Sequence, residues 1–440
     1  MHPTATKPLI AIACGGTGGH LFPGIAVAQQ LAQRGCRVTL LISPKDVDQQ
    51  AVKSASGLEV VTLPAVALQR GRRIAFFLGF AKSYLAARNY FKVNPPHAAL
   101  AMGGFTSVPP VLAAKRCGAK TFLHESNTIP GKANRVLARF VHCAFVGFPE
   151  ATVKLKSRQS VVTGTPVRPQ FQPRDTAECR RALGFDPARP VVLVMGGSQG
   201  ASGVNELLIR SLPLLAQTVP HWQWLHLTGP NDAENVRAAY RNAELTALVY
   251  PFFAEMEIVL GAAAAAVTRA GASSLAEFAA MRLPTVLVPL PTAADNHQFF
   301  NAHVFEQSGA ARLLEQATAT PEQLVPHLRE LVEGGDARSG IQTALAKWHA
   351  PNAAQEIAEQ ILANVNCPQS NVSSAPLINT PLQRGARHDE TRFNRFNGFD
   401  GGRETVETVS SAPGSANTPL KRGVNETTVS AGLNSLERVA

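Results

Sequence analysis

The feature that most constrains the fold is a series of short apolar segments, each followed by glycine, proline or polar residues. In the first third of the chain these segments are Leu9 to Ala13, Val38 to Ile42, Leu58 to Leu63, Ala98 to Met102, Thr121 to His124 and His142 to Val146. Such runs are typical of strands buried on both faces of a sheet. Amphipathic stretches at 23–33 and 74–91 predict crossover helices, which gives a doubly wound parallel sheet.

The same pattern restarts after a break. Glycine and prolines cluster between residues 163 and 173, which predicts a linker. The apolar segments then resume as Val191 to Met195, Gln223 to Leu227, Ala247 to Tyr250, Ala263 to Arg269, Thr285 to Val288 and Ala310 to Leu314. Helices are expected over 321–333 and 353–363, the last packing back on the first domain. The prediction is an α/β protein with two Rossmann-like domains, 1–165 and 166–365.

Beyond these domains the composition changes. Residues 366–440 are rich in Ser, Thr, Asn, Gly, Pro and Arg, and they lack apolar periodicity. Such a segment cannot bury enough surface to offset the entropy of ordering it, so a disordered tail is predicted.

Composition narrows the class of protein. Hydrophobic residues make up 45% of the 440, yet no apolar run approaches the length that spans a bilayer, and the apolar N-terminal segment is too short for a secretory signal. We therefore expect a cytoplasmic protein. The six cysteines are scattered without zinc-ligand spacing, which favours buried thiols, and the net charge of +11 favours anionic partners.

Three glycine-rich loops follow predicted strands, at 15–20 (GGTGGH), 102–105 (MGGF) and 196–200 (GGSQG). Glycine after a strand lets backbone N–H groups approach a phosphate at a helix N-terminus. A dinucleotide fingerprint would need glycine where Leu21 stands and an acid where Ser43 stands, so NAD is disfavoured. Gly131-Lys132-Ala133 lacks the hydroxyl residue of an ATP-binding P-loop.

Asp46-Val47-Asp48 has the Asp-x-Asp form used by metal-dependent sugar transferases. Carboxylates that favour the positive end of a helix dipole are the better interpretation here. We expect no metal or other cofactor, with helix N-termini and fixed cations or hydroxyls stabilising a leaving group instead.

Seven motifs, in order along residues 7–363, resemble those of the MurG family of GT-B glycosyltransferases. They are GGTGGHLFPGIAVA (15–28), MGGFTSVPPVLAA (102–114), LHESNTIPGKANRVLA (123–138), TGTPVR (163–168), MGGSQGA (195–201), TRAGASSLAE (268–277) and ADNHQFFNA (294–302). The resemblance implies two Rossmann-like domains facing across a cleft. It also implies inverting transfer of N-acetylglucosamine (GlcNAc) from UDP-GlcNAc to the C4 hydroxyl of the muramyl sugar of lipid I, an undecaprenyl-diphospho-MurNAc-pentapeptide, which yields lipid II for peptidoglycan synthesis.

The resemblance also carries site roles to this chain. Donor-binding positions are Thr17, Gly18, Gly19, Asn127, Arg168, Ser198, Phe253, Ala272, Ser273, Ser274, Leu275, Ala276, Glu277 and Gln298, and Gly103 and Gly104 fall in the loop expected to face the acceptor diphosphate. The chemistry agrees with these roles. Arg168 has a fork of donors suited to a diphosphate, Ser198 adds a hydroxyl, and Glu277 suits the ribose hydroxyls. Taken singly, Arg168 also fits a linker salt bridge and Glu277 a solvated helix charge.

A proton acceptor is needed when a sugar hydroxyl attacks directly. His20 is the first choice for this base, and Glu125 is the second. A positioning or helix-capping role for His20 stays open.

The lipid acceptor requires that the protein reach the cytoplasmic face of the membrane as a peripheral protein. A basic and aromatic cluster predicts this surface, namely Arg70, Arg72, Arg73, Phe76, Phe77 and Phe80. Burial of these phenylalanines against their own sheet is the competing interpretation.

Three alternatives remain. Another GT-B transferase with a different lipid acceptor would have a similar donor site, and a UDP-GlcNAc 2-epimerase would need no acceptor. A sensor or scaffold would bind UDP-GlcNAc without turnover. Nucleic acid is not expected as a partner, since no basic stripe is interleaved with aromatic residues.

Overall fold

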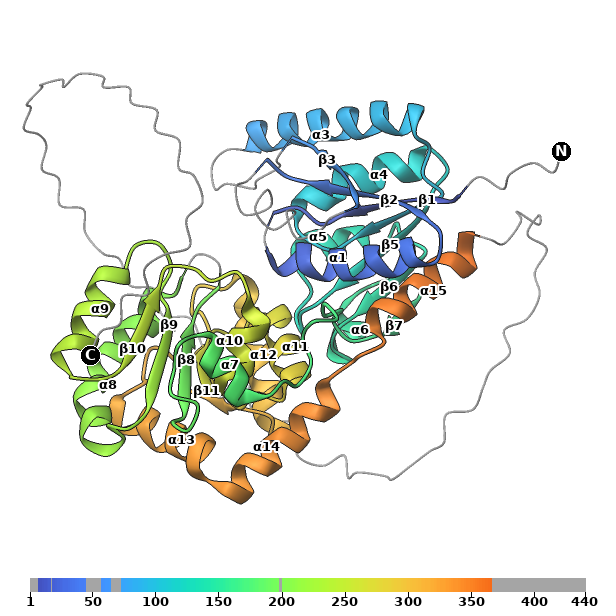
Figure 1. The fold of residues 1–440 in the computed structure, drawn as a ribbon. Coiled ribbons are helices and arrows are strands. Elements are labelled where there is room, and N and C mark those ends of the chain that lie inside the picture. The colour runs from blue at the N-terminus through green and yellow to red at the C-terminus, as the bar shows by residue number, and fades with distance from the viewer. Residues whose placement is uncertain (1–6, 17, 45–56, 65–72, 198–199, 366–440) are drawn as a thin grey trace, which may run out of the picture. The chain divides into compact units, whose positions relative to one another are not determined.

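A computed structural model describes residues 7–16, 18–44, 57–64, 73–197 and 200–365. This part contains two parallel sheets, one in each half of the sequence (Figure 1). The predicted α/β class is confirmed. Asp46-Val47-Asp48 and the predicted tail lie outside the described residues.

The first sheet has seven strands in the order β3-β2-β1-β4-β5-β6-β7, and every neighbouring pair is parallel. Its strands are β1 (Leu9–Ala13), β2 (Arg37–Ile42), β3 (Glu59–Thr62), β4 (Ala98–Ala101), β5 (Lys120–Glu125), β6 (Cys143–Val146) and β7 (Ser160–Val162). The helices between them are α1 (Gly18–Gln33), α3 (Arg73–Val93), η1 (Phe105–Ser107), α4 (Val108–Arg116), α5 (Lys132–Leu137) and α6 (Glu150–Lys154).

Alternate residues of β1 face different helices, as the two-residue period of a strand requires. Ile10 and Ile12 belong to a core cluster with residues of α1, whereas Ala11 and Ala13 belong to a second cluster with residues of α3 and α4. The C-terminal helix α15 (Ala353–Val365) contributes to the first of these clusters through Ile357 and lies against α1. The last described helix therefore helps to build the core of the first sheet.

The second sheet has the order β10-β9-β8-β11-β12-β13 and is also parallel throughout. Its strands are β8 (Val191–Met195), β9 (Gln223–Leu227), β10 (Ala247–Tyr250), β11 (Ala263–Thr268), β12 (Thr285–Leu287) and β13 (Arg312–Leu313). Its helices are α7 (Thr176–Ala182), α8 (Ser202–Thr218), α9 (Ala233–Asn242), α10 (Met256–Ala262), α11 (Ala272–Met281), η2 (Ala294–Asn296), α12 (His297–Gln307), α13 (Pro321–Glu333) and α14 (Gly335–Trp348).

Each sheet reverses its strand order at one point, between β1 and β4 in the first and between β8 and β11 in the second. Loops at the carboxyl ends of strands diverge at such a point and leave room for a ligand. The glycine-rich loops at 15–20, 102–105 and 196–200 follow β1, β4 and β8. All three therefore lie where a doubly wound sheet binds its ligands.

The structure differs from the sequence-based expectation at several elements, among them β7 and α1. Strand β7 was not predicted, because it is a short edge strand whose side chains are only partly buried, so it has no continuous apolar run. Helix α1 begins at Gly18 and contains Pro23, although proline is usual only in the first turn of a helix. The segment 163–173 contains no helix or strand, as expected for a linker.

Candidate functional site

The second glycine loop, at 102–105, packs against the ring of His20, which is the last residue of the first loop. Gly103 and Gly104 have φ angles of 120° and 74°, and a Cβ added to Gly103 would lie 2.6 Å from His20 Cε1. Only glycine adopts this backbone freely and leaves space for the ring. Thr106 Oγ1 donates a hydrogen bond to Gly15 O at 2.6 Å, which joins the loop after β4 to the loop after β1. The two loops are therefore joined to each other, and the second lies against the imidazole.

A proline in helix α1 leaves a backbone carbonyl available for a hydrogen bond from the second domain. Pro23 has no N–H, so the Gly19 carbonyl four residues earlier lacks its helical donor. The Ser273 hydroxyl, in the first turn of α11, donates to this carbonyl at 2.8 Å. Pro23 therefore provides the acceptor by which α11 is tied to the glycine loop.

Glu125 holds the loop that follows β5. Its Oε1 accepts from the backbone and side-chain amides of Asn127 at 2.9 and 3.0 Å. Its Oε2 accepts from Gly131 N and Asn134 Nδ2, both at 2.9 Å. Four donors thus surround one buried carboxylate, which fixes Asn127 in place.

Arg168 comes from the linker and is only 8% exposed. Its guanidinium lies 4.1 Å from the centre of the Phe22 ring of α1 and 4.8 Å from that of Phe171. Its Nη2 is 3.7 Å from Glu277 Oε1, while its Nε has no hydrogen-bond partner among the described residues. The two rings and Glu277 therefore hold the guanidinium in place, but they leave its Nε without a hydrogen-bond acceptor.

Glu277 lies on α11, one turn after Ser273, with its side chain 16% exposed. Burial raises the pKa of its carboxyl group to about 7, against the lowering effect of Arg168. Removal from water disfavours the charged form more than the single guanidinium restores it. Glu277 therefore titrates near neutral pH.

Asn301 was not predicted as a site residue, and it connects the loops on which the site depends. It is completely buried on α12. Its Oδ1 accepts from the backbone N–H and hydroxyl of Thr128, each at 3.0 Å. Its Nδ2 donates to Asn127 Oδ1 at 3.0 Å and to Ala270 O at 3.2 Å. Every hydrogen-bonding position of this amide is used, and it joins the loop after β5 to the turn that begins α11.

The remaining predicted residues fall in several places. Gln298 lies in the first turn of α12. Its Oε1 accepts from Leu290 N at 3.0 Å, which leaves the amide N–H groups as its free polar atoms in the described structure. Phe253 follows β10 and packs against Tyr250. Thr17 and Ser198 lie outside the described residues, as do Arg70 and Arg72 and the side chain of Arg73.

Helix α3 carries an exposed apolar face near its start. Ile74, Phe77 and Leu78 are 78%, 67% and 59% exposed. By contrast, Phe76 contacts Phe105, and Phe80 packs against the core cluster on that side of the sheet. The predicted membrane surface is thus divided, with only Phe77 of the three phenylalanines directed to solvent. In the described part of the chain, no helix is long and apolar enough to cross a membrane.

Comparison with protein-family models identifies the class of enzyme to which the two domains belong. Residues 10–146 match the glycosyltransferase family 28 N-terminal domain, and residues 191–361 match its C-terminal domain. Together with the two parallel sheets, these matches define a GT-B glycosyltransferase.

Comparison with individual proteins narrows this class. A UDP-N-acetylglucosamine–N-acetylmuramyl-(pentapeptide) pyrophosphoryl-undecaprenol N-acetylglucosamine transferase from an Anaeromyxobacter strain is 35% identical over 361 residues, which cover 79% of this chain and 91% of that protein. The crystal structure of Acinetobacter baumannii MurG matches with a TM-score of 0.62 at 29% identity, over 81% of this chain and 99% of that one. The chain belongs to the MurG family.

A more distant match shows the fold alone. A UDP-N-acetylglucosamine 2-epimerase structure gives a TM-score of 0.62, with 84% of this chain and 100% of that one covered, but only 12% identity. The same pair of sheets therefore supports different chemistry, and the site residues must separate the two activities.

The raised pKa of Glu277 predicts a change in stability with pH. The folded protein holds this proton more tightly than the unfolded chain, so the stability that Glu277 contributes below its ordinary pKa of 4.5 is lost as the pH rises through about 7. Glu277→Gln removes this loss. From about pH 5 to about pH 8, the free energy of unfolding of the variant should therefore rise relative to wild type, by up to about 3 kcal/mol.

Urea unfolding of both proteins at the two pH values measures this difference. Glu356→Gln, at an exposed position of α15, is the control and should show no comparable change. A difference between Glu277→Gln and wild type that is the same at both pH values would contradict the assignment.

Proposed function

We propose that this chain transfers GlcNAc from UDP-GlcNAc to the C4 hydroxyl of the muramyl sugar of lipid I, with inversion, to give lipid II and UDP. The observation that carries the proposal is the pair of Arg168 with Glu277 of α11, a helix whose first turn is bonded to the glycine loop of α1. Membership of the MurG family supports the choice of donor and acceptor.

The donor nucleotide is recognised by charge and by hydrogen bonds. Arg168 presents a buried guanidinium, with Nε unpartnered, to the diphosphate. Glu277, in its ionised form, accepts hydrogen bonds from the ribose hydroxyls. The N-terminus of α11, from Ala272 to Ser274, supplies backbone N–H groups beside them, and its small side chains permit close approach.

The sugar is bound by side chains that other parts of the protein hold in place. Gln298 directs its amide N–H groups to the GlcNAc hydroxyls, since Leu290 already occupies its carbonyl oxygen. Asn127 is fixed by Glu125 and Asn301, and it presents its second amide hydrogen. Hydrogen bonds of this kind distinguish GlcNAc from its epimers, because a misplaced hydroxyl leaves a polar group unpaired.

His20 is the proposed base. As the C4 oxygen of the acceptor forms its bond to the anomeric carbon of GlcNAc, the proton of that hydroxyl passes to the imidazole. The bond from the anomeric carbon to the diphosphate oxygen breaks with its electron pair, and UDP leaves from the opposite face, which inverts the configuration. Glu125 is the weaker candidate for the base, because four hydrogen bonds already occupy its oxygens.

We propose that no divalent ion takes part. The charge that develops on UDP is stabilised by Arg168 and by the positive end of α11, which are in place before the reaction begins.

The acceptor requires a membrane, and we propose that the start of α3 reaches its cytoplasmic surface. Ile74, Phe77 and Leu78 form an exposed apolar face. Arg70, Arg72 and Arg73 precede it in the sequence and suit an anionic leaflet. This combination supports reversible peripheral binding.

Release of UDP from UDP-GlcNAc, with and without a soluble lipid I analogue, tests the reaction. We expect release that depends on the acceptor and persists in a chelator. In His20→Gln the turnover number should fall about 10²-fold to 10⁴-fold, with the dissociation constant of UDP unchanged, because a base acts only in the transition state.

The other outcomes select the alternatives. UDP release without any acceptor would favour an epimerase, and release with diacylglycerol but not with the lipid I analogue would favour another lipid glycosyltransferase. Near-normal turnover of His20→Gln would remove the assignment of the base.

Co-sedimentation with phosphatidylglycerol vesicles tests the membrane surface. Phe77→Ser should lower the partition coefficient about fivefold to tenfold, because one phenyl ring is withdrawn from the interface. Val153→Ser, at an 88% exposed apolar position on α6, is the matched control and should bind as wild type does. Equal loss in both variants, or none in Phe77→Ser, would contradict the proposal.

A further inference from the structure

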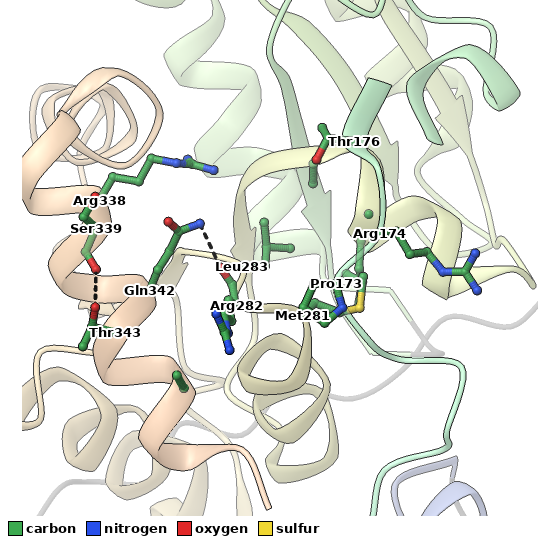
Figure 2. A pocket seen from close by; sticks show the side chains of 14 residues that line it. Pro173, Arg174, Thr176, Met281, Arg282, Leu283, Arg338, Ser339, Gln342 and Thr343 are labelled. Atoms are coloured by element: carbon green, nitrogen blue, oxygen red, sulfur yellow. Dashed lines mark hydrogen bonds between the residues drawn. The ribbon is translucent and has the colours of Figure 1, made fainter. Parts of the chain in front are cut away.

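A concave site lies in the second domain, at the C-terminal end of α11. It is a cavity of about 610 Å³ between α14 and the segment that leads into α7 (Figure 2). Its polar lining includes Thr176, Arg282, Arg338, Ser339, Gln342 and Thr343. We call it the arginine cavity. None of the proposed donor-binding residues lines it.

Arg338 is held rigidly beside this cavity. Its Nη1 donates to Ala264 O and to Leu331 O, both at 2.6 Å. These carbonyls fix the guanidinium but do not neutralise its charge. Burial, and then the nearby charge of Arg180, lower the pKa of Arg338. Figure 2 shows its side chain reaching from α14 toward the space between the elements.

Arg282 occupies an unusual backbone position at the same cavity. It ends α11 with φ 51° and ψ 38°, in the left-handed region where helices commonly place glycine. An L-residue with a side chain is disfavoured there. Gln342 Nε2 donates to its carbonyl at 3.4 Å, which links the end of α11 to α14. An arginine retained at such a strained backbone position is a candidate for a functional role of its side chain.

No Asp or Glu is among the described residues that line this cavity. Within the described ranges, no ion pair includes Arg282, Arg338 or Arg174, whose guanidinium turns away from the space in Figure 2. Thr176 and Ser339 add hydroxyl groups to the same lining, whereas the Thr343 hydroxyl donates to Ser339 O at 2.9 Å. The fixed Arg338 guanidinium and the exposed Arg282 guanidinium, together with these hydroxyl groups, match the oxygen atoms of a phosphate.

We propose that the arginine cavity binds a small phosphate-bearing anion through Arg282 and Arg338, separately from the proposed donor site. The phosphate group is either free, as in a small metabolite, or carried by a lipid headgroup. The shared chemistry is a compact anion with several acceptor oxygens. The apolar side chains of Leu260 and Met281 at the same lining accept the uncharged part of the ligand.

Calorimetric titration of the full chain with inorganic pyrophosphate, in saturating UDP, tests this site. Arg282→Gly removes the guanidinium and suits the left-handed backbone, so the fold should be retained, and a melting curve checks this. We expect this variant to bind pyrophosphate about tenfold or more weakly than wild type, since one charged hydrogen-bonding group is lost. Arg329→Gln, at an exposed arginine of α13, should bind within twofold of wild type.

A second titration, with dihexanoyl phosphatidylglycerol below its micelle concentration, distinguishes the two sources of phosphate. Binding of either probe to wild type that is weaker in Arg282→Gly supports the site. The probe that wild type binds more tightly identifies the source of the phosphate. No binding of either probe to wild type, or equal affinity in Arg282→Gly and wild type, would overturn the proposal.

Discussion

Arg168 carries its positive charge into a nearly buried position beside the rings of Phe22 and Phe171. Among the described residues, the carboxylate that pairs with it is that of Glu277. Burial of a charge is costly unless it is paired and hydrogen-bonded. The carboxylate of Glu277 is itself disfavoured by burial, so at neutral pH it neutralises the guanidinium only in part. A diphosphate would supply the missing charge and a partner for Nε. The site is therefore arranged to gain from an anionic ligand.

This pairing depends on contacts that connect the two sheets. Arg168 belongs to the linker, Phe22 to α1 and Glu277 to α11, so the charge is correctly placed only when all three segments are in register. Asn301 and the Ser273–Gly19 hydrogen bond join the same segments at two further points. Rigid support of this kind reduces the reorganisation that a reaction must otherwise overcome. Asn301 therefore supports catalysis by positioning these segments, without contacting the substrate itself.

Much of this arrangement could be predicted from local sequence. Strands buried on both faces leave continuous apolar runs, and twelve predicted segments correspond to β1–β6 and β8–β13. The glycine loops were recognisable because a tight turn after a strand requires glycine. Strand β7 left no such pattern, since it is short and half exposed at the sheet edge.

Other features depended on contacts far apart in the chain. Asn301 bonds Thr128, 173 residues earlier, and no local pattern reports such a pair. The start of α1 was placed too late, because Pro23 is usually an N-terminal helix residue, whereas here its missing N–H serves a contact with α11. The phenylalanines of α3 could not be divided between core and solvent until the positions of Phe105 and the sheet were known.

The most direct measurement of the central claim is a crystal structure of the protein with UDP bound. The account predicts the diphosphate within hydrogen-bonding distance of the Arg168 guanidinium, and the ribose hydroxyls within the same distance of the Glu277 carboxylate. A nucleotide bound elsewhere, with the Arg168–Glu277 pair unchanged, would contradict it.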